Sequence, residues 1–138
     1  MIFTFIGIAI GWCILDWMFF GSAWAQRVVF SKMSPGVWSG PVLGESTEHA
    51  QRRTMVRSTL LTIFSAFFFT LLGEWVGAQA FDRYSALLFG AFLWSAFIFP
   101  VFALDRLYLT VGTRYTFLQW VAWSAKIGLG LGLFLLRG

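Results

Sequence analysis

The sequence predicts an all-α membrane protein: a single domain, residues 1–138, in which four transmembrane helices form a bundle and a long cytoplasmic loop follows the first helix. Three observations support this prediction: the apolar composition, four apolar stretches of spanning length, and a one-sided distribution of basic residues. Hydrophobic residues make up 59% of the chain and charged residues only 12%, whereas a soluble domain carries roughly 25% charged residues. A domain of this size cannot hide so much apolar surface from water, so we expect lipid to cover its outer face.

Four apolar stretches are long enough to cross a bilayer. A transmembrane helix needs about 20 predominantly apolar residues, and the segments that meet this requirement are Ile2–Trp24, Ser58–Ala80, Ser85–Leu104 and Tyr115–Leu136. The main connection, Ala25–Arg57, separates the first two. We expect it to be an interfacial and cytoplasmic loop whose second half forms a short polar helix that runs into the second span. Ser46 is a suitable N-cap residue for this helix.

The basic residues are concentrated in two connections. The connections after the first and third spans carry seven of them, whereas the opposite side carries only Arg83 and Arg137. The positive-inside rule places these two connections in the cytoplasm and both termini outside. Membrane topology therefore explains the net charge of +4 without a nucleic-acid partner. The seven residues are Arg27, Lys32, Arg52, Arg53, Arg57, Arg106 and Arg114.

The sequence lacks the residues for most metal and redox chemistry. Its single cysteine, Cys13, and its single histidine, His49, are too few for a structural zinc site, an iron–sulfur cluster or paired haem ligands. The chain also contains no H-E-x-x-H motif and no recognisable Ser/His/Asp set. We therefore expect no metal, no cofactor and no catalytic residue, and we predict that the protein is not an enzyme.

Three ionisable residues lie inside the predicted spans: Asp16, Glu74 and Lys126. Each costs about 2.5–3.5 kcal/mol at the centre of a membrane helix, so we expect each to have a partner. At a rise of about 1.5 Å per residue, Asp16 lies ~12 Å and Lys126 ~16 Å from the cytoplasmic ends of their spans. We therefore predict an ion pair between these two residues. Glu74, at ~24 Å, is expected either to be hydrated near the outer surface or to meet Lys126.

Small and polar residues form a stripe on each of two spans. On the fourth span the stripe contains Gln119, Ala122, Lys126 and Gly130. On the second span, with Glu74 at its edge, the stripe contains Thr59, Thr62, Ala66, Thr70, Gly73 and Gly77. We favour the interpretation that both stripes are packing seams, because small residues let helices approach closely. The alternative is that they line a cavity or a conduction path.

Three spans contain G-x-x-x-G pairs, which promote helix packing within one chain or between copies. The pairs are Gly7 with Gly11, Gly73 with Gly77, and Gly128 with Gly132. On the first span, Asp16 points roughly opposite the glycine pair, so we expect this helix to need protein contacts on two sides. A single four-helix chain supplies such contacts poorly, which favours a homo-oligomer or a larger membrane complex.

Short motifs in the first and third spans are similar to those of one protein family. The segment FGSAW at residues 20–24, the polar connection after it, three further spans, and the spacing of Gly90 and Trp94 resemble a family of small four-helix bacterial membrane proteins, one of the domain-of-unknown-function families. Members typically carry Trp-Tyr and a proline before the Phe-Gly segment, where this chain has ILDW at residues 14–17. The resemblance implies a four-helix, multi-pass protein of the bacterial cytoplasmic (inner) membrane and implies no catalytic residue.

Two functions fit these observations. We favour a non-enzymatic structural or accessory subunit of a membrane assembly, because the chain is small, has several small-residue seams and lacks a catalytic constellation. Its expected partners are membrane lipids and either further copies of itself or a larger membrane complex, with no nucleic acid. The alternative is a small transporter or channel for an ion or small solute that uses Asp16, Glu74 and Lys126.

Overall fold

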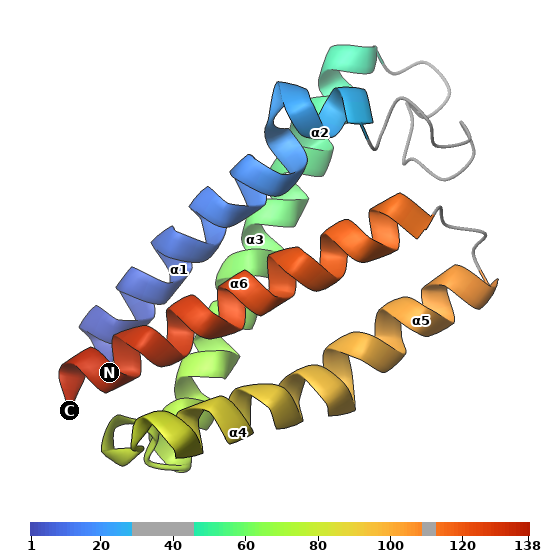
Figure 1. Cartoon of the computed structure of the whole chain (residues 1–138). Helices are drawn as coiled ribbons and strands as arrows, with labels where there is room; N and C mark the ends of the chain where they lie inside the picture. Colours follow the sequence, from blue (N-terminus) through green and yellow to red (C-terminus); the bar gives the residue numbers. More distant parts are fainter. Residues whose placement is uncertain (29–45, 109–112) are drawn as a thin grey trace.

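The computed structural model describes residues 1–28, 46–108 and 113–138, and every regular element in these ranges is a helix (Figure 1). Four helical segments are long and apolar enough to cross a membrane: Ile2–Gly21, Met55–Trp75, Arg83–Leu104 and Thr113–Arg137. The predicted all-helical fold with four candidate spans is therefore confirmed. Both termini lie at the same end of the molecule, as an even number of spans requires.

The first span consists of two helical types. Helix α1 (Ile2–Asp16) continues as a π-helical turn, η1 (Trp17–Gly21), and extended backbone at Ser22 (ψ 152°) then breaks the helix. A short helix, α2 (Ala23–Val28), follows. The first span was predicted to run unbroken to Trp24, so it is shorter than expected. Most of the long loop predicted after it, residues 29–45, lies outside the described residues.

Helix α3 (Thr47–Trp75) contains both the predicted polar helix and the second span. The Ser46 side chain accepts a hydrogen bond from the backbone N–H of His49 at 3.3 Å, which confirms the predicted N-cap. The helix ends earlier than predicted because Gly77 adopts the left-handed conformation (φ 71°), which glycine tolerates without steric cost. A 3-10 turn, η4 (Ala78–Ala80), replaces the expected last helical turn.

The third span changes helical type near its middle. It consists of α4 (Arg83–Leu93), the π-helical turn η5 (Trp94–Ile98) and α5 (Phe99–Tyr108). Asp82 caps its start by accepting a hydrogen bond from the backbone N–H of Ser85 at 2.8 Å. Pro100 lies just after η5 and lacks the N–H that an α-helix would use there. The backbone at this point forms a π turn, in which the N–H of Phe99 bonds to the carbonyl of Trp94.

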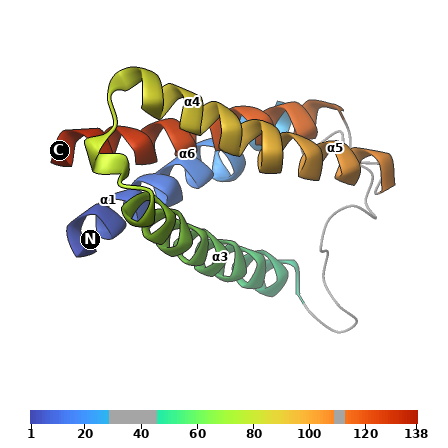
Figure 2. The same ribbon diagram turned by 90° about the horizontal axis from the view of Figure 1, so that it is seen from below.

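Helix α6 (Thr113–Arg137) lies at the centre of the molecule. It packs against α1 on one side and along α4, η5 and α5 on another, while α1 also packs along α3 (Figures 1 and 2). We call α1, α3 and α6 the core, and α4, η5 and α5 the arm. The arm packs along α6, and Figure 2 shows α3 on the other side of the molecule.

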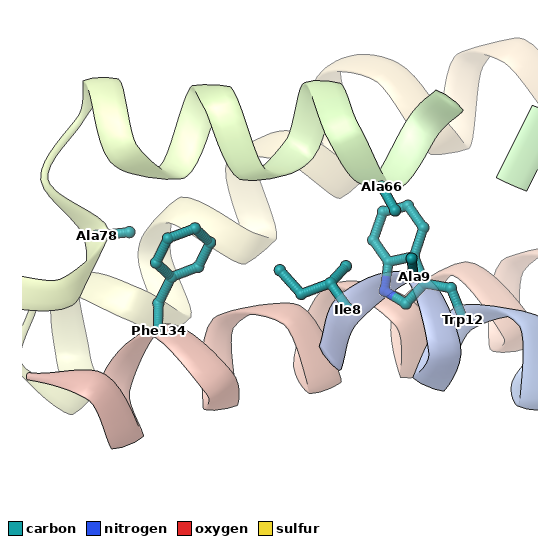
Figure 3. Close-up of a cluster of buried hydrophobic side chains, with 6 residues drawn as sticks. All are labelled: Ile8, Ala9, Trp12, Ala66, Ala78 and Phe134. Atoms are coloured by element: carbon teal, nitrogen blue, oxygen red, sulfur yellow. The ribbon is translucent and has the colours of Figure 1, made fainter. Parts of the chain in front are cut away.

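The apolar centre of the core lies between α1, α3 and α6. Its fully covered side chains include Trp12 from α1 and Phe134 from α6 (Figure 3). A Cβ added to Gly73 would overlap the Phe134 ring, and one added to Gly130 would overlap Phe69. Glycine at these two positions therefore lets a phenyl ring lie against a helix backbone. The full cluster is Ile8, Ala9, Trp12, Ala66, Ala78 and Phe134.

Candidate functional site

Asp16 and Lys126 form the predicted ion pair inside the core. The Lys126 Nζ atom lies 2.5 Å from Asp16 Oδ1, and the two side chains are only 6% and 17% exposed. Asp16 is the last residue of α1, and Lys126 lies in the middle of α6. Burying one unpaired charge in a bilayer is costly. The pair therefore removes this cost from α6, which is one of the four candidate membrane spans.

Thr62 of α3 brings the third core helix into this site. Its hydroxyl donates a hydrogen bond of 2.5 Å to Asp16 Oδ2, the carboxylate oxygen on the other side from the lysine. Hydrogen bonds from a hydroxyl to a carboxylate are shorter and stronger than those between neutral groups. A single carboxylate therefore binds both α6 and α3 to the end of α1.

Two tryptophans surround the Lys126 ammonium. Its Nζ lies 4.6 Å from the Trp123 ring centroid and 5.8 Å from that of Trp12, within the range of a cation–π interaction. Trp12 also donates from Nε1 to the backbone carbonyl of Lys126 at 2.8 Å. The two indoles meet edge to face, with centroids 5.6 Å apart. Trp12, Trp123, Thr62 and the ion pair together form what we call the polar lock.

An apolar groove lies next to the polar lock on the outer face of α1 and α3. Its volume is about 380 Å³. Cys13 and Trp17, which line it, flank Asp16 in the sequence. The lining is almost entirely apolar, so the groove suits hydrocarbon and offers almost no polar ligands to an ion. The lining residues are Ala9, Ile10, Cys13, Ile14, Trp17 and Ile63.

Glu74 belongs to a separate ionic cluster at the end of the molecule that carries both termini. It forms an ion pair with Arg137, and its Oε1 lies 3.5 Å from the Met1 amine. Its expected alternative partner, Lys126, binds Asp16 instead. The Glu74 side chain is 22% exposed, so this cluster is more accessible than the polar lock. The cluster joins the ends of the same three helices, α1, α3 and α6.

The two predicted stripes face the inside of the core. Ala122, Lys126 and Gly130 are buried on α6, and Thr62, Ala66 and Thr70 are buried on α3. Gln119 is not part of the polar lock, and its amide donates to the hydroxyl of Tyr115 on the same helix at 2.7 Å. Thr59 is exposed and bonds to the backbone of Met55. The interpretation as packing seams therefore agrees with most of these positions.

The six glycines of the G-x-x-x-G pairs differ in their surroundings. A Cβ added to Gly7 or Gly11 would meet Leu133 or Leu129 of α6, at 3.3 and 2.9 Å. Gly73 contacts Phe134, whereas Gly77 ends α3. Nothing lies within 4 Å of a Cβ added to Gly128 or Gly132, so this pair is open.

The expectation that α1 needs a second protein chain rested on a wrong premise. Gly7 and Gly11 were expected to face one partner and Asp16 another. In the structure α6 contacts both glycines and also supplies the ion-pair partner of Asp16, while α3 supplies Thr62. One chain therefore supplies the contacts of these three residues of α1, and the homo-oligomer or larger membrane complex stays a prediction.

A second aromatic cluster joins the arm to α6. The Phe99 ring stacks on Trp120 with centroids 5.2 Å apart, and Trp94 lies 5.6 Å from Phe99. The indole nitrogens of Trp94 and Trp120 are buried, and neither has a hydrogen-bond partner in the described part of the chain. A buried N–H without a partner is unfavourable. This cluster therefore differs from the polar lock, in which Trp12 has its acceptor.

Within residues 1–28, 46–108 and 113–138, no three His, Cys, Asp or Glu side chains lie close enough together to hold a metal ion. Comparisons of the chain with models of protein families, with curated proteins and with solved structures gave no match. Membership of the four-helix bacterial family therefore stays a prediction from short motifs. The class that the fold itself defines is a multi-pass, all-helical protein with four candidate membrane spans.

Proposed function

We propose that this protein is a non-enzymatic structural or accessory subunit of a membrane assembly. One observation carries the proposal: the chain covers its four spans very unevenly. Of the fourth span, 39% is buried inside the chain, but of the third span only 6%. The core has the contacts of a self-sufficient unit, whereas the arm packs along α6 on one side and leaves every side chain of the third span except Ala86 at least partly exposed to lipid or to another protein.

The pairing of the intramembrane charges supports a structural role. Asp16 and Lys126 bind each other, Thr62 binds Asp16, and Glu74 binds Arg137. These contacts hold helices together and use the groups that would otherwise bind an ion or transfer a proton. The polar residues of the core therefore have a sufficient explanation in the stability of the bundle.

The surface that we assign to the partner includes the open glycine face of α6. A Cβ added to Gly128 or Gly132 would meet no atom within 4 Å, so a second helix can approach the α6 backbone closely there. The exposed side chains of the arm extend the apolar surface available to a partner. They include Leu87, Leu88, Phe92 and Phe97.

Our proposal for the location is the bacterial cytoplasmic membrane, with both termini outside. The basic residues at the end opposite the termini support this orientation through the positive-inside rule. Cysteine labelling of a Gly138→Cys variant tests it in intact cells, after Cys13 is replaced by serine. Labelling by a membrane-impermeant reagent supports the orientation, whereas labelling only after lysis reverses it.

A transporter or channel is the second candidate, and one observation favours it. The π-helical turn η1 begins directly after Asp16, and π turns occur frequently at functional sites. Flux into liposomes that depends on both Asp16 and Glu74 would establish this function. Equal flux for the parent, Asp16→Asn and Glu74→Gln proteins would exclude a role for these charges in transport.

Site-directed cross-linking in native membranes tests the subunit proposal. In a Cys13→Ser background, a cysteine at Phe92 of the arm is compared with one at Phe64 of α3. The two phenylalanines are equally exposed, at 62%, so they form a matched pair. We expect the Phe92→Cys variant to give a defined cross-linked species and the Phe64→Cys variant to give none. Equal cross-linking at both positions, or none at Phe92→Cys, contradicts the proposal.

A further inference from the structure

Three exposed arginines lie at the end of the molecule opposite the termini. Arg52 and Arg57 belong to α3 and Arg114 belongs to α6. None of the three has an ion-pair partner within the described part of the chain. We call this end the basic end and the end with Met1 and Gly138 the terminal end.

In the sequence, the net charge comes from the two connections that follow the first and the third spans. These two connections hold seven basic residues and three acidic ones, Glu45, Glu48 and Asp105. The terminal end holds two of each sign, and the polar lock holds one of each. The two connections therefore account for the whole net charge of +4, and Arg52, Arg57 and Arg114 are three of the exposed basic residues at the basic end.

The positions of Arg52 and Arg57 along α3 indicate which layer of a bilayer their side chains would reach. The second span begins at Met55, so Arg52 lies ~4.5 Å beyond its start and Arg57 ~3 Å within it. The headgroup layer on each side of the hydrocarbon is about 5–8 Å thick. A long arginine side chain at the edge of the hydrocarbon extends its guanidinium into this layer. Arg52 and Arg57 are therefore at the level of lipid phosphates.

Arg114 lies at a similar depth on a different helix. The fourth span has 25 residues and is ~37 Å long, which exceeds the ~30 Å hydrocarbon thickness. Its second residue, Arg114, is therefore close to the boundary between the hydrocarbon and the headgroup layer. Exposed apolar side chains lie beside the arginines on α3, with Met55 63% and Val56 51% exposed. Charged and apolar groups thus alternate over the depth at which headgroups meet acyl chains.

We propose that the basic end is a docking surface for the phosphodiester groups of anionic lipids, held by Arg52, Arg57 and Arg114. Guanidinium groups bind phosphate through paired, charge-assisted hydrogen bonds. An anionic headgroup keeps its net negative charge, whereas choline neutralises the phosphate of phosphatidylcholine. A soluble acidic protein or a nucleic acid fits less well, because its ligands would lie beyond the headgroup layer. The surface does not depend on the subunit proposal.

Native mass spectrometry of the purified protein with equal amounts of phosphatidylglycerol and phosphatidylcholine tests the proposal. The parent is expected to bind phosphatidylglycerol preferentially. Each arginine replaced by glutamine at the basic end is expected to lower this preference about fivefold, so the Arg52→Gln/Arg57→Gln variant loses more than Arg114→Gln. Arg83→Gln at the terminal end is the matched control, since Arg83 is also exposed, and it should keep the parent's preference.

A charge-conserving variant distinguishes a loss of positive charge from a loss of folded protein. Arg52→Lys/Arg57→Lys should retain most of the preference for phosphatidylglycerol, because it keeps both positive charges. An unchanged preference in the glutamine double variant, or an equal loss in Arg83→Gln, overturns the proposal. So does displacement of the lipid by single-stranded RNA through the same arginines, which would assign the surface to a nucleic acid.

Discussion

The core and the arm differ in hydropathy and in burial, and the more apolar of the two regions is the less buried one. The third span, which forms most of the arm, is the most apolar of the four and the least buried, whereas the fourth span, in α6, is the least apolar and the most buried. In water the most apolar helix would be the most buried. In a bilayer, lipid solvates apolar side chains as well as protein does, so helices associate through small residues, tight packing and polar bonds.

Polar groups show the same contrast. In the polar lock the Trp12 indole has the Lys126 carbonyl as acceptor, while at the interface between the arm and α6 the indoles of Trp94 and Trp120 have no partner in the described residues. The polar lock therefore has its indole N–H bonded at the centre of the core. The arm makes a less complete interface, which is consistent with the proposal that a further component completes it.

The largest predicted difference between the two regions concerns their phenylalanines. Phe134 of the core is fully buried, and Phe92 of the arm is 62% exposed. We expect Phe134→Ala to lower the free energy of unfolding by about 3 kcal/mol, because a cavity replaces a fully buried ring that packs against Phe69 and Gly73 of α3. Phe92→Ala should change it by less than about 0.5 kcal/mol. Unfolding in mixed micelles with increasing SDS measures both values, and equal losses would remove the distinction between core and arm.

Alanine variants of two glycines compare a closely packed face of the core with an open one. Gly73→Ala places a methyl group against the Phe134 ring, and we expect a loss of about 1–3 kcal/mol from overpacking. Gly132→Ala meets no residue within 4 Å, so the isolated chain should be as stable as the parent or slightly more stable. The same SDS titration serves for both variants. A large loss in Gly132→Ala would show that this face packs within the chain.

A smaller difference in stability is expected between variants of Trp12 and Trp94. Trp12→Phe removes the donor to the Lys126 carbonyl and should cost about 0.5–1.5 kcal/mol. Trp94→Phe removes a buried N–H that has no partner in the described residues, so stability should stay the same or rise. Thermal unfolding in detergent compares the two. A greater loss for Trp94→Phe would mean that its indole has an acceptor supplied by a bound molecule.

The smallest predicted effect is a pH dependence of the stability of the first turn of α4, at the start of the arm. Hydrogen bonds from the Ser85 hydroxyl and backbone N–H lower the pKa of Asp82 below its ordinary value. A lowered pKa in the folded protein means that the cap stabilises the protein above the ordinary pKa of about 4. This stabilisation is lost as the pH falls through the folded-state pKa.

Protection of the first amides of α4 against hydrogen exchange should therefore decrease at acidic pH, relative to that of α6. Asp82→Asn keeps an acceptor that does not titrate, so its protection at α4 should not depend on this ionisation. The same acid-induced decrease in Asp82→Asn and in the parent would assign the effect to another group.

The sequence predicts the spans and the ion pair well because both depend on distance along a helix axis. Apolar length locates the spans, and the depths of Asp16 and Lys126 indicate that they meet. The ends of the spans were less predictable. Extended backbone at Ser22 and a left-handed Gly77 end two helices within runs of mostly apolar residues that showed no break.

The remaining partners depend on how helices rotate against each other, which a single sequence does not show. Thr62 was placed on a polar stripe, but its bond to Asp16 follows from the packing of α3 on α1. Trp12 and Trp123 were not predicted as partners of the ion pair, although each lies one helical turn before Asp16 or Lys126, and this spacing is the signal that could have indicated them. The same G-x-x-x-G spacing gave a packed pair at Gly7 and Gly11 and an open pair at Gly128 and Gly132.

A double-mutant cycle on Asp16 and Lys126 tests most directly whether the polar lock holds the core together. Asp16→Asn and Lys126→Met should each lower the free energy of unfolding in detergent by about 3–5 kcal/mol, because each leaves one buried charge without its partner. The double variant contains neither charge and should lose less than either single variant. Losses that simply add in the double variant would show that the two residues do not stabilise each other, and would contradict this account of the core.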